Sequence, residues 1–221
     1  MLRFLVSTFW RPYVTWYLKK PRRYNRAGLS MLVQPGVFHP GFFFSTKFLL
    51  TFLEEKKAAL KNKTFLELGA GSGLLGLFAG KHGAKVTASD ISKTAVENIV
   101  ANAASNHIAI TAVHSDLFDR IDPQTFDFIV INPPYYKKKP ATEAEQAWYC
   151  GEELEYFQEL FSQLGNYMHP ASEVYMILSD DCDLEGIRSI ASQRQFGMKP
   201  ETSKRIAWEI NTIFRLKEKE P

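Results

Sequence analysis

Beyond residue 63, short apolar segments alternate with longer segments whose apolar residues recur at helical spacing. The short segments predict strands at Thr64–Leu68, Lys85–Ser89, Ile110–His114, Phe126–Ile131 and Val174–Leu178. The longer segments predict helices at Leu74–His82, Lys93–Ser105, Glu152–Tyr167 and Leu184–Gln193. Because strands that alternate with helices are typical of βαβ units, most of the sheet should be parallel.

The two ends of the chain depart from this alternation. Gly197–Ser203 and Trp208–Leu216 predict two strands with little between them, and hence an antiparallel final pair. Ser45–Leu60 has the spacing of a helix, whereas residues 1–35 are rich in proline, arginine and aromatic residues. We expect a basic aromatic extension over residues 1–35. Residues 36–221 should form one doubly wound α/β domain, with a seven-stranded, mostly parallel sheet, helices on both faces and an antiparallel C-terminal hairpin.

The composition fits one ordinary globular domain, because 45% of the 221 residues are hydrophobic. No stretch approaches the roughly 18 consecutive apolar residues of a membrane span, and the first residues lack a signal-peptide cleavage site. A cytoplasmic protein without membrane association is therefore expected. Cys150 and Cys182 are far apart and lack His or Cys neighbours at metal-ligand spacing, so neither a metal site nor a disulfide is predicted.

The net charge of +3 conceals an asymmetry along the chain. Residues 1–53 contain eight Lys and Arg and no Asp or Glu, whereas residues 54–221 hold the other 19 basic residues and all 24 acidic ones. Aromatic residues interleave with the basic ones in the first segment, a composition that favours contact with phosphates and stacked bases. A solvated basic arm whose aromatic side chains pack on the domain is the alternative.

A glycine-rich loop follows the first predicted strand and leads into an apolar helix. Its glycines are Gly69, Gly71 and Gly73. Glycine lets the chain turn sharply and lets a ligand approach the backbone, where N–H groups of the helix N-terminus face it. Because Gly71–Gly76 also matches the dinucleotide-binding pattern, the loop alone fits an NAD-dependent enzyme as well.

Acidic residues follow the next two predicted strands. Asp90 ends the second strand 21 residues after Gly69, where its carboxylate can accept hydrogen bonds from both ribose hydroxyls of an adenosine. Asp116 follows the third strand, where it can accept from the amino group of an adenine while Leu117 or Phe118 packs on the ring. Capping of a following helix is the alternative role for Asp116.

The sequence Asn132-Pro133-Pro134-Tyr135 follows the fourth predicted strand. An amide or aniline-type nitrogen is a poor nucleophile because its lone pair is delocalised. The Asn132 side-chain oxygen and the Pro133 carbonyl can accept the two N–H groups of such a nitrogen and localise its lone pair. The prolines stiffen that carbonyl, and Tyr135 can stack on the planar group. This chemistry requires neither a metal nor a covalent intermediate.

These segments resemble a known family. Glu67–Gly73 resembles motif I of class I S-adenosylmethionine-dependent methyltransferases, and Asn132–Tyr135 resembles the Asn-Pro-Pro-Tyr motif of those that modify planar nitrogens. The resemblance implies a Rossmann-like methyltransferase fold with S-adenosylmethionine as cofactor. The candidate cofactor-binding residues are Glu67, Gly69, Gly71, Gly73, Asp90, Asp116 and Leu117, and the candidate catalytic residues are Asn132, Pro133 and Tyr135.

Residues 36–216 are most similar to the HemK family of release-factor glutamine methyltransferases. Besides the two motifs, the similarity includes Ala147–Glu153 and the closing pair of strands. It implies N-methylation of a protein glutamine amide and a protein partner such as a release factor. The exocyclic amine of a nucleobase in RNA or DNA, adenine N6 or guanine N2, is the alternative acceptor. A cofactor-binding module without catalysis is a third interpretation.

Three further features flank the two motifs. Phe38–Thr46 precedes motif I, where several HemK relatives carry acidic residues, and we expect this segment near the cofactor. Lys137–Lys139 directly follow the second motif, where they can meet substrate phosphates or acidic side chains, or form a solvated loop. Tyr136 either lines the substrate pocket or fills the core.

Overall fold

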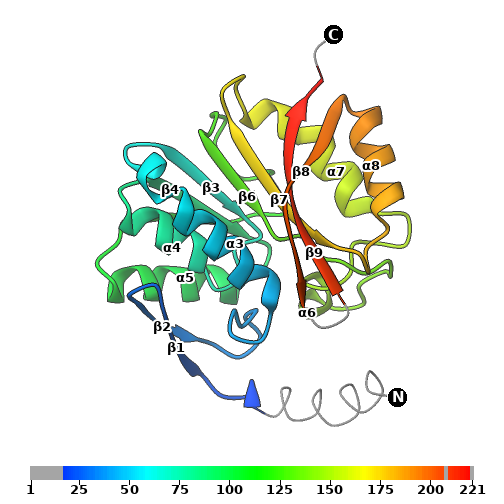
Figure 1. Ribbon diagram of the computed structural model, residues 1–221. Helices are drawn as coiled ribbons and strands as arrows, with labels where there is room; N and C mark the ends of the chain where they lie inside the picture. The colour runs from blue at the N-terminus through cyan, green and yellow to red at the C-terminus, as the bar shows by residue number, and fades with distance from the viewer. Residues whose placement is uncertain (1–16, 207–208, 220–221) are drawn as a thin grey trace.

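The computed structural model describes residues 17–206 and 209–219. Within these residues a seven-stranded sheet has the strand order β5-β4-β3-β6-β7-β9-β8 (Figure 1). The strands are β3 (Thr64–Leu68), β4 (Lys85–Asp90), β5 (Ile110–His114), β6 (Phe128–Ile131), β7 (Glu173–Ser179), β8 (Phe196–Ile206) and β9 (Glu209–Glu218). β3 to β7 are parallel, whereas β9 is antiparallel to both β7 and β8. The predicted sheet and its antiparallel final pair are confirmed.

Helices cover both faces of the sheet, as predicted for a doubly wound fold (Figure 1). The helical elements are α3 (Phe44–Glu55), η2 (Lys57–Leu60), α4 (Leu74–Lys81), α5 (Lys93–Ser105), α6 (Glu143–Gln146), α7 (Glu155–Gln163), η3 (Leu164–Tyr167) and α8 (Leu184–Gln193). α3, α4 and α5 lie on one face, and α7 and α8 lie on the other. No helix in the described part of the chain is long and apolar enough to cross a membrane.

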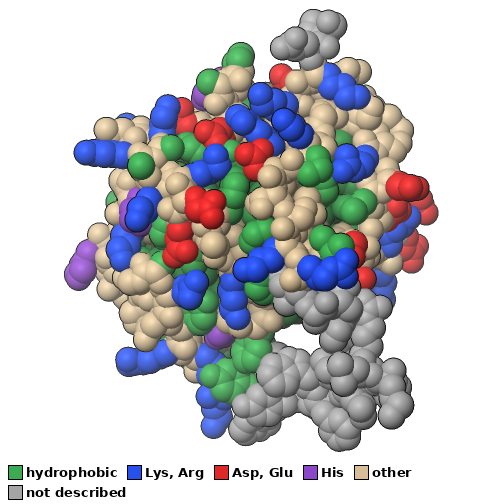
Figure 2. Space-filling view, viewed as in Figure 1, with side chains coloured by type: hydrophobic (Ala, Val, Ile, Leu, Met, Phe, Trp, Pro, Cys, Tyr) green, Lys and Arg blue, Asp and Glu red, His purple; other side chains and the backbone are tan. Residues whose placement is uncertain are grey.

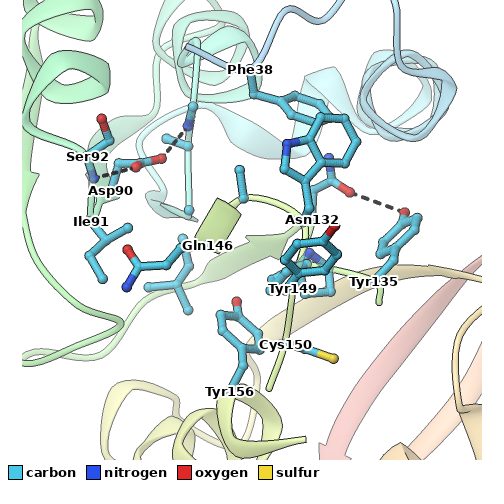
Figure 3. Close-up of a pocket in the computed structure, with 18 of the residues that line it drawn as sticks. Phe38, Asp90, Ile91, Ser92, Asn132, Tyr135, Gln146, Tyr149, Cys150 and Tyr156 are labelled. Atoms are coloured by element: carbon cyan, nitrogen blue, oxygen red, sulfur yellow. Dashed lines mark hydrogen bonds between the residues drawn. The ribbon is translucent and has the colours of Figure 1, made fainter. Parts of the chain in front are cut away.

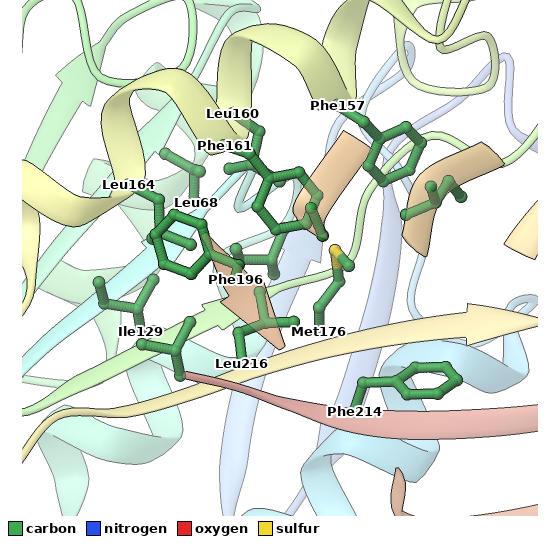
Figure 4. Close-up of a cluster of buried hydrophobic side chains, with 14 of the residues drawn as sticks. Leu68, Ile129, Phe157, Leu160, Phe161, Leu164, Met176, Phe196, Phe214 and Leu216 are labelled. Carbon is green, nitrogen blue, oxygen red and sulfur yellow. The ribbon is translucent and has the colours of Figure 1, made fainter. Parts of the chain in front are cut away.

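The central strands are apolar throughout because they are buried from both sides. Along β6, Ile129 and Ile131 point into the core under α7 and α8, whereas Phe128 and Val130 point into the core under α3 and α4. Figure 4 shows the first of these cores, where side chains from α7 meet those of β7, β8 and β9. This packing holds the ends of the central strands in fixed positions.

Two predicted elements begin later than the sequence indicated. The helix predicted from Glu152 begins at Glu155, because Leu154 has a left-handed backbone with φ of 61° that a helix cannot include. The strand predicted from Phe126 begins at Phe128. The backbone N–H of Phe126 instead donates to the carbonyl of Tyr167, 3.0 Å away, outside the sheet.

An antiparallel hairpin precedes the domain and was not predicted. It consists of β1 (Arg22–Arg26) and β2 (Leu29–Val33), which pair outside the main sheet. Both turn residues, Ala27 and Gly28, have positive φ, as in a type I′ hairpin turn. Along β2, alternate side chains are buried, the period-two pattern that could have indicated a strand.

Two asparagines of α5 and the asparagine that caps its C-terminus bind the outer edge of β2. Asn98, Asn102 and Asn106 are four residues apart, so they share one face of the helix. Asn106 accepts the N–H of Ser30 at 3.0 Å and donates to its carbonyl at 2.8 Å. At Leu32, Asn102 accepts the N–H at 2.8 Å, and both Asn98 and Asn102 donate to the carbonyl. The side-chain amides thus take the place of a third strand at an otherwise open edge.

The hairpin therefore packs on the domain through residues that were assigned to the N-terminal extension. The boundary predicted between residues 35 and 36 stays a prediction, and residues 1–16 lie outside the described residues.

Replacement of Asn102 by alanine should destabilise the protein by about 2–3 kcal/mol. The side chain is only 2% exposed, and its loss leaves the Leu32 N–H without its amide acceptor. Urea unfolding measures the effect, with the solvent-facing Glu97→Ala on the same helix as a control that should change stability by less than about 0.5 kcal/mol. Equal effects of the two substitutions would contradict the proposed role of the amides.

Candidate functional site

The strand order places the candidate site at a topological switch point. The chain passes from β3 outward to β4 and β5, then returns to form β6 on the opposite side of β3. Ligands of open α/β sheets bind at such reversals, beyond the carboxyl ends of the strands. Leu68, the last residue of β3, pairs level with the ends of β4 and β6. Gly69, Asp90 and Asn132 therefore lie side by side at the carboxyl end of the sheet.

A cavity of about 1120 Å³ opens at this position. Its volume exceeds the roughly 300–1,000 Å³ of most small-molecule sites, so it has room for a cofactor together with part of a second ligand. The predicted site residues on its wall are Glu67, Gly69, Gly71, Asp90, Asp116, Leu117, Asn132, Pro133 and Tyr135. Gly73 is the exception, because it caps α4 and lies next to Ile99 rather than on the cavity wall.

The glycine loop presents bare backbone to the cavity. Gly69 has φ of 68°, and a Cβ built on it would have no protein atom within 4 Å. A ligand can therefore approach the backbone closely there. Gly71 has φ of 52°, and a Cβ on it would lie 3.2 Å from the Cβ of Phe38. The segment that was expected near the cofactor thus packs directly over the loop.

Asp90 connects the end of β4 to the glycine loop. Its Oδ2 accepts the Gly71 N–H at 2.7 Å, and its Oδ1 accepts the Ser92 N–H at 2.8 Å (Figure 3). A carboxylate has about four lone-pair sites, so these bonds orient Asp90 while leaving it able to accept from a ligand. Binding of ribose hydroxyls by Asp90 stays a prediction, and this geometry is compatible with it.

Glu67 is buried beside the cavity, but its carboxylate is held by α4. Oε2 accepts the Gly76 N–H at 2.6 Å and Oε1 accepts the Leu75 N–H at 3.4 Å. These groups belong to the first turn of α4, whose positive dipole end favours an anion. Burial raises the pKa of the Glu67 carboxyl to about 8, although the two N–H bonds act in the opposite direction. Glu67 thus has a structural role, and its contact with the cofactor stays a prediction.

Glu67→Gln should change how stability depends on pH. A carboxyl whose folded-state pKa lies above its unfolded value of roughly 4.3 favours the folded state when protonated. That contribution is fully present below about pH 4 and is lost as pH rises toward about 8. Glutamine does not titrate, so the variant should gain up to about 4 kcal/mol relative to wild type between pH 4 and 8. Urea unfolding at several pH values measures this difference. Parallel pH profiles would contradict the assignment, and the exposed Glu97→Gln is the control.

Asp116 and Leu117 follow β5 and line the cavity beside α7. Burial raises the pKa of the Asp116 carboxyl, and the charges of Asp119 and Glu159 raise it further. Leu117 has φ of 41°, a left-handed conformation that costs a non-glycine residue energy and often marks a functional site. In the described part of the chain no helix begins between β5 and β6. The alternative interpretation, in which Asp116 caps a following helix, is therefore wrong.

Asn132 is held at both ends of its amide. Its Nδ2 donates to the Thr46 hydroxyl at 3.2 Å, and its Oδ1 accepts from the Tyr135 hydroxyl at 3.3 Å (Figure 3). Burial raises the pKa of Tyr135 far above its ordinary value, so the hydroxyl remains a donor. The sequence did not predict this positioning role for Tyr135. Its stacking on an acceptor stays a prediction.

Aromatic residues that sequence reasoning did not assign to the site line much of the rest of the cavity. They include Trp148, Tyr149 and Tyr156. Trp148 and Tyr149 lie in the segment similar to HemK proteins, which was the only signal for them. Tyr136 also lines the cavity and is 45% exposed, so it does not fill the core. Lys137 pairs with Asp183 at 3.1 Å, whereas Lys139 reaches the cavity wall.

Comparison with known proteins identifies the family. A family model described as Methyltransferase small domain matches residues 28–151. A Methanocaldococcus jannaschii protein named putative protein N5-glutamine methyltransferase is 31% identical over 189 residues, covering 81% of this chain and 89% of that one. The chain belongs to the methyltransferase small-domain family. The predicted enzyme class is confirmed, and the NAD-dependent alternative for the glycine loop is set aside.

Other proteins to which the chain is similar act on different molecules, as their names state. Ribosomal RNA small subunit methyltransferase C of Chromohalobacter salexigens is 28% identical over 182 residues, which cover 78% of this chain and 54% of that protein. The solved ribosomal protein L11 methylase of Lactobacillus delbrueckii subsp. bulgaricus superposes with a TM-score of 0.61 at 24% identity, covering 85% of this chain and 84% of that one. Its similarity confirms the Rossmann-like methyltransferase fold.

The cavity of this methyltransferase suits S-adenosylmethionine, the methyl donor that its family assignment supports. The donor carries a sulfonium and an ammonium cation, and the wall is rich in carboxylates. The acidic lining residues are Asp90, Asp116, Glu152, Glu155, Glu159 and Glu209, together with Glu67, whose raised pKa of about 8 keeps it mostly protonated near neutral pH. Lys139 is the only Lys or Arg among the described lining residues. Ser89 also lines the cavity. Its buried Oγ has no hydrogen-bond partner among the described residues, so it offers the cofactor a further polar contact. No group of three or more potential metal ligands occurs in the described segments.

Proposed function

We propose that this methyltransferase methylates a planar nitrogen, and that its acceptor is the side-chain amide of a protein glutamine. The position of Asn132 carries this proposal. Its amide is fixed by Thr46 and Tyr135 on the wall of the cavity that also contains the glycine loop. An acceptor nitrogen beside Asn132 would therefore face the cofactor.

When bound, S-adenosylmethionine supplies an electrophilic methyl group. Asn132 Oδ1 retains a lone pair after accepting from Tyr135, and the Pro133 carbonyl lies one residue further on. These two oxygens would accept both N–H groups of the amide and disfavour delocalisation of its lone pair. Because Asn132 is held before the acceptor arrives, little reorganisation is needed at the moment of reaction.

The charge around the cavity favours glutamine over a nucleobase. The many carboxylates of the wall would repel the phosphates of a nucleic acid, and among the described lining residues only one lysine opposes them. On the face of the described residues shown in Figure 2, basic side chains are interspersed with acidic ones. The relative with high coverage of both chains is also named as a glutamine methyltransferase. A protein partner such as a release factor is consistent with these observations.

A nucleobase amine is the second candidate, and the aromatic lining of the cavity favours it. Planar bases stack on such side chains, and one relative is named as a ribosomal RNA methyltransferase. The predicted contact of the basic extension with phosphates belongs to this alternative. Its first 16 residues lie outside the described residues.

Transfer of a labelled methyl group into a cell extract distinguishes the two acceptors. The purified enzyme is incubated with methyl-labelled S-adenosylmethionine and extract, and the products are treated with protease or nuclease. We expect label in macromolecules that protease releases and nuclease does not. Release by nuclease alone would favour the nucleobase. The Asn132→Ala variant serves as the control for background transfer.

A further inference from the structure

We propose that Trp148 is the aromatic wall against which the planar acceptor group lies, and that it contributes to acceptor binding. This inference rests on the proposed function and deepens it, because it identifies a residue that would contact the planar acceptor group beside Asn132.

The backbone fixes Trp148 beside the motif that contains Asn132. The Trp148 carbonyl accepts the N–H groups of both Tyr135 and Tyr136, at 3.1 and 2.9 Å. Two residues further on, the Cys150 N–H donates to the Tyr136 carbonyl at 3.0 Å. The chain at Trp148 and directly after it is therefore bonded to the end of the motif that contains Asn132 and to the next residue, Tyr136.

The indole is supported on one side by two phenylalanines. Its ring centroid lies 4.9 Å from that of Phe43, at an interplanar angle of 68°, and 5.6 Å from that of Phe38. Phe38 and Phe43 stack on each other at 3.9 Å. Phe38 in turn packs over Gly71 of the cofactor loop. These contacts link Trp148 to both the donor and the acceptor sides of the cavity.

Trp148 nevertheless remains 38% exposed, and it lines the cavity. Burial of apolar surface is favourable, and an aromatic face that is preorganised and partly exposed offers such surface to a planar ligand. Asn132 and Tyr149, both labelled in Figure 3, line the same cavity. An acceptor placed beside Asn132 would thus lie within reach of the indole.

The strength of this contact should depend on the acceptor. Stacking of a base on an aromatic side chain is worth about 1–3 kcal/mol by alanine substitution, or roughly 5- to 150-fold in affinity. A glutamine amide presents a smaller planar area and should lose about 3- to 10-fold. A loss well above 10-fold would therefore indicate a base.

The test compares steady-state kinetics of Trp148→Ala, Trp148→Phe and Trp148→Leu with wild type. The acceptors are a peptide containing one glutamine and an RNA oligonucleotide, and cofactor affinity is measured by calorimetry. For the acceptor that wild type methylates, we expect KM to rise in the alanine variant by the factor given above. Phenylalanine should restore most of the loss, and leucine less, since it has volume but no planar face. The cofactor Kd should change by less than about 3-fold. Val100→Ala, at an exposed site on α5, is the control.

An unchanged KM in the alanine variant would overturn the inference, as would equal recovery by leucine and phenylalanine. A cofactor Kd that weakens as much as KM would also overturn it, because Trp148 would then belong to the donor site. Failure of the glutamine proposal is a separate result: wild type would methylate the RNA and not the peptide. Methylation of neither acceptor would overturn both proposals.

Discussion

Asp90→Ala is expected to weaken S-adenosylmethionine binding by one to several factors of about ten. The substitution would remove two charge-assisted hydrogen bonds to the ribose, each worth roughly 1.5–3 kcal/mol. It would also remove the acceptor of the Gly71 N–H, which holds the glycine loop in position. Calorimetric titration of the purified protein with the cofactor measures the change.

Two variants make this experiment specific. Asp90→Asn keeps one oxygen acceptor of similar shape but removes the charge, so its affinity should be intermediate. Asp122→Ala removes a solvent-exposed carboxylate and should leave the affinity unchanged. Wild-type affinity in Asp90→Ala would show that this carboxylate does not hold the cofactor.

Asn132→Ala should reduce kcat by about 10²–10³-fold, or roughly 2.7–4 kcal/mol of transition-state stabilisation. The lost oxygen acts on the acceptor nitrogen as that nitrogen gains positive charge, and not on the cofactor. Cofactor affinity should therefore stay within a small factor of wild type. Single-turnover kinetics and calorimetry separate these two effects.

Asn132→Asp should be less damaging than Asn132→Ala. It keeps an oxygen that accepts from Tyr135, and the Thr46 hydroxyl can rotate to donate to the second oxygen. Its negative charge lies beside a developing cation. The expected order of turnover is wild type, then Asp, then Ala. Turnover near the wild-type level in a folded Asn132→Ala protein would remove the main reason for choosing a nitrogen acceptor.

The parts of the site that the sequence predicts are those set by short, local patterns. The apolar strands predicted the mostly parallel sheet, and the residues that follow Leu68 and Ile131, Gly69 and Asn132, were recognised because each comes directly after a buried strand. The glycine loop needs residues with positive φ. The sequence indicates this need, because glycine adopts positive φ more readily than other residues. The strand-end position of Asp90 followed from the same reasoning.

The parts that the sequence did not predict depend on contacts between distant segments. Asn98, Asn102 and Asn106 read as the polar face of a helix, because nothing local shows that β2 packs there. The carboxylate of Glu67 can bind either a ligand or the N-terminus of α4, and only the fold shows the second. The position of Trp148 depends on how its loop folds back on the motif around Asn132.

We propose that this methyltransferase places the methyl group on a planar nitrogen held by Asn132. Tandem mass spectrometry of the product formed with deuterated-methyl S-adenosylmethionine tests it most directly, because fragmentation locates the added methyl on one atom. We expect the labelled methyl on the amide nitrogen of glutamine or, for the second candidate, on the exocyclic amine of adenine or guanine. The Asn132→Ala protein should form about 100-fold less of this labelled product. A methyl group on oxygen, sulfur or carbon would contradict the proposal.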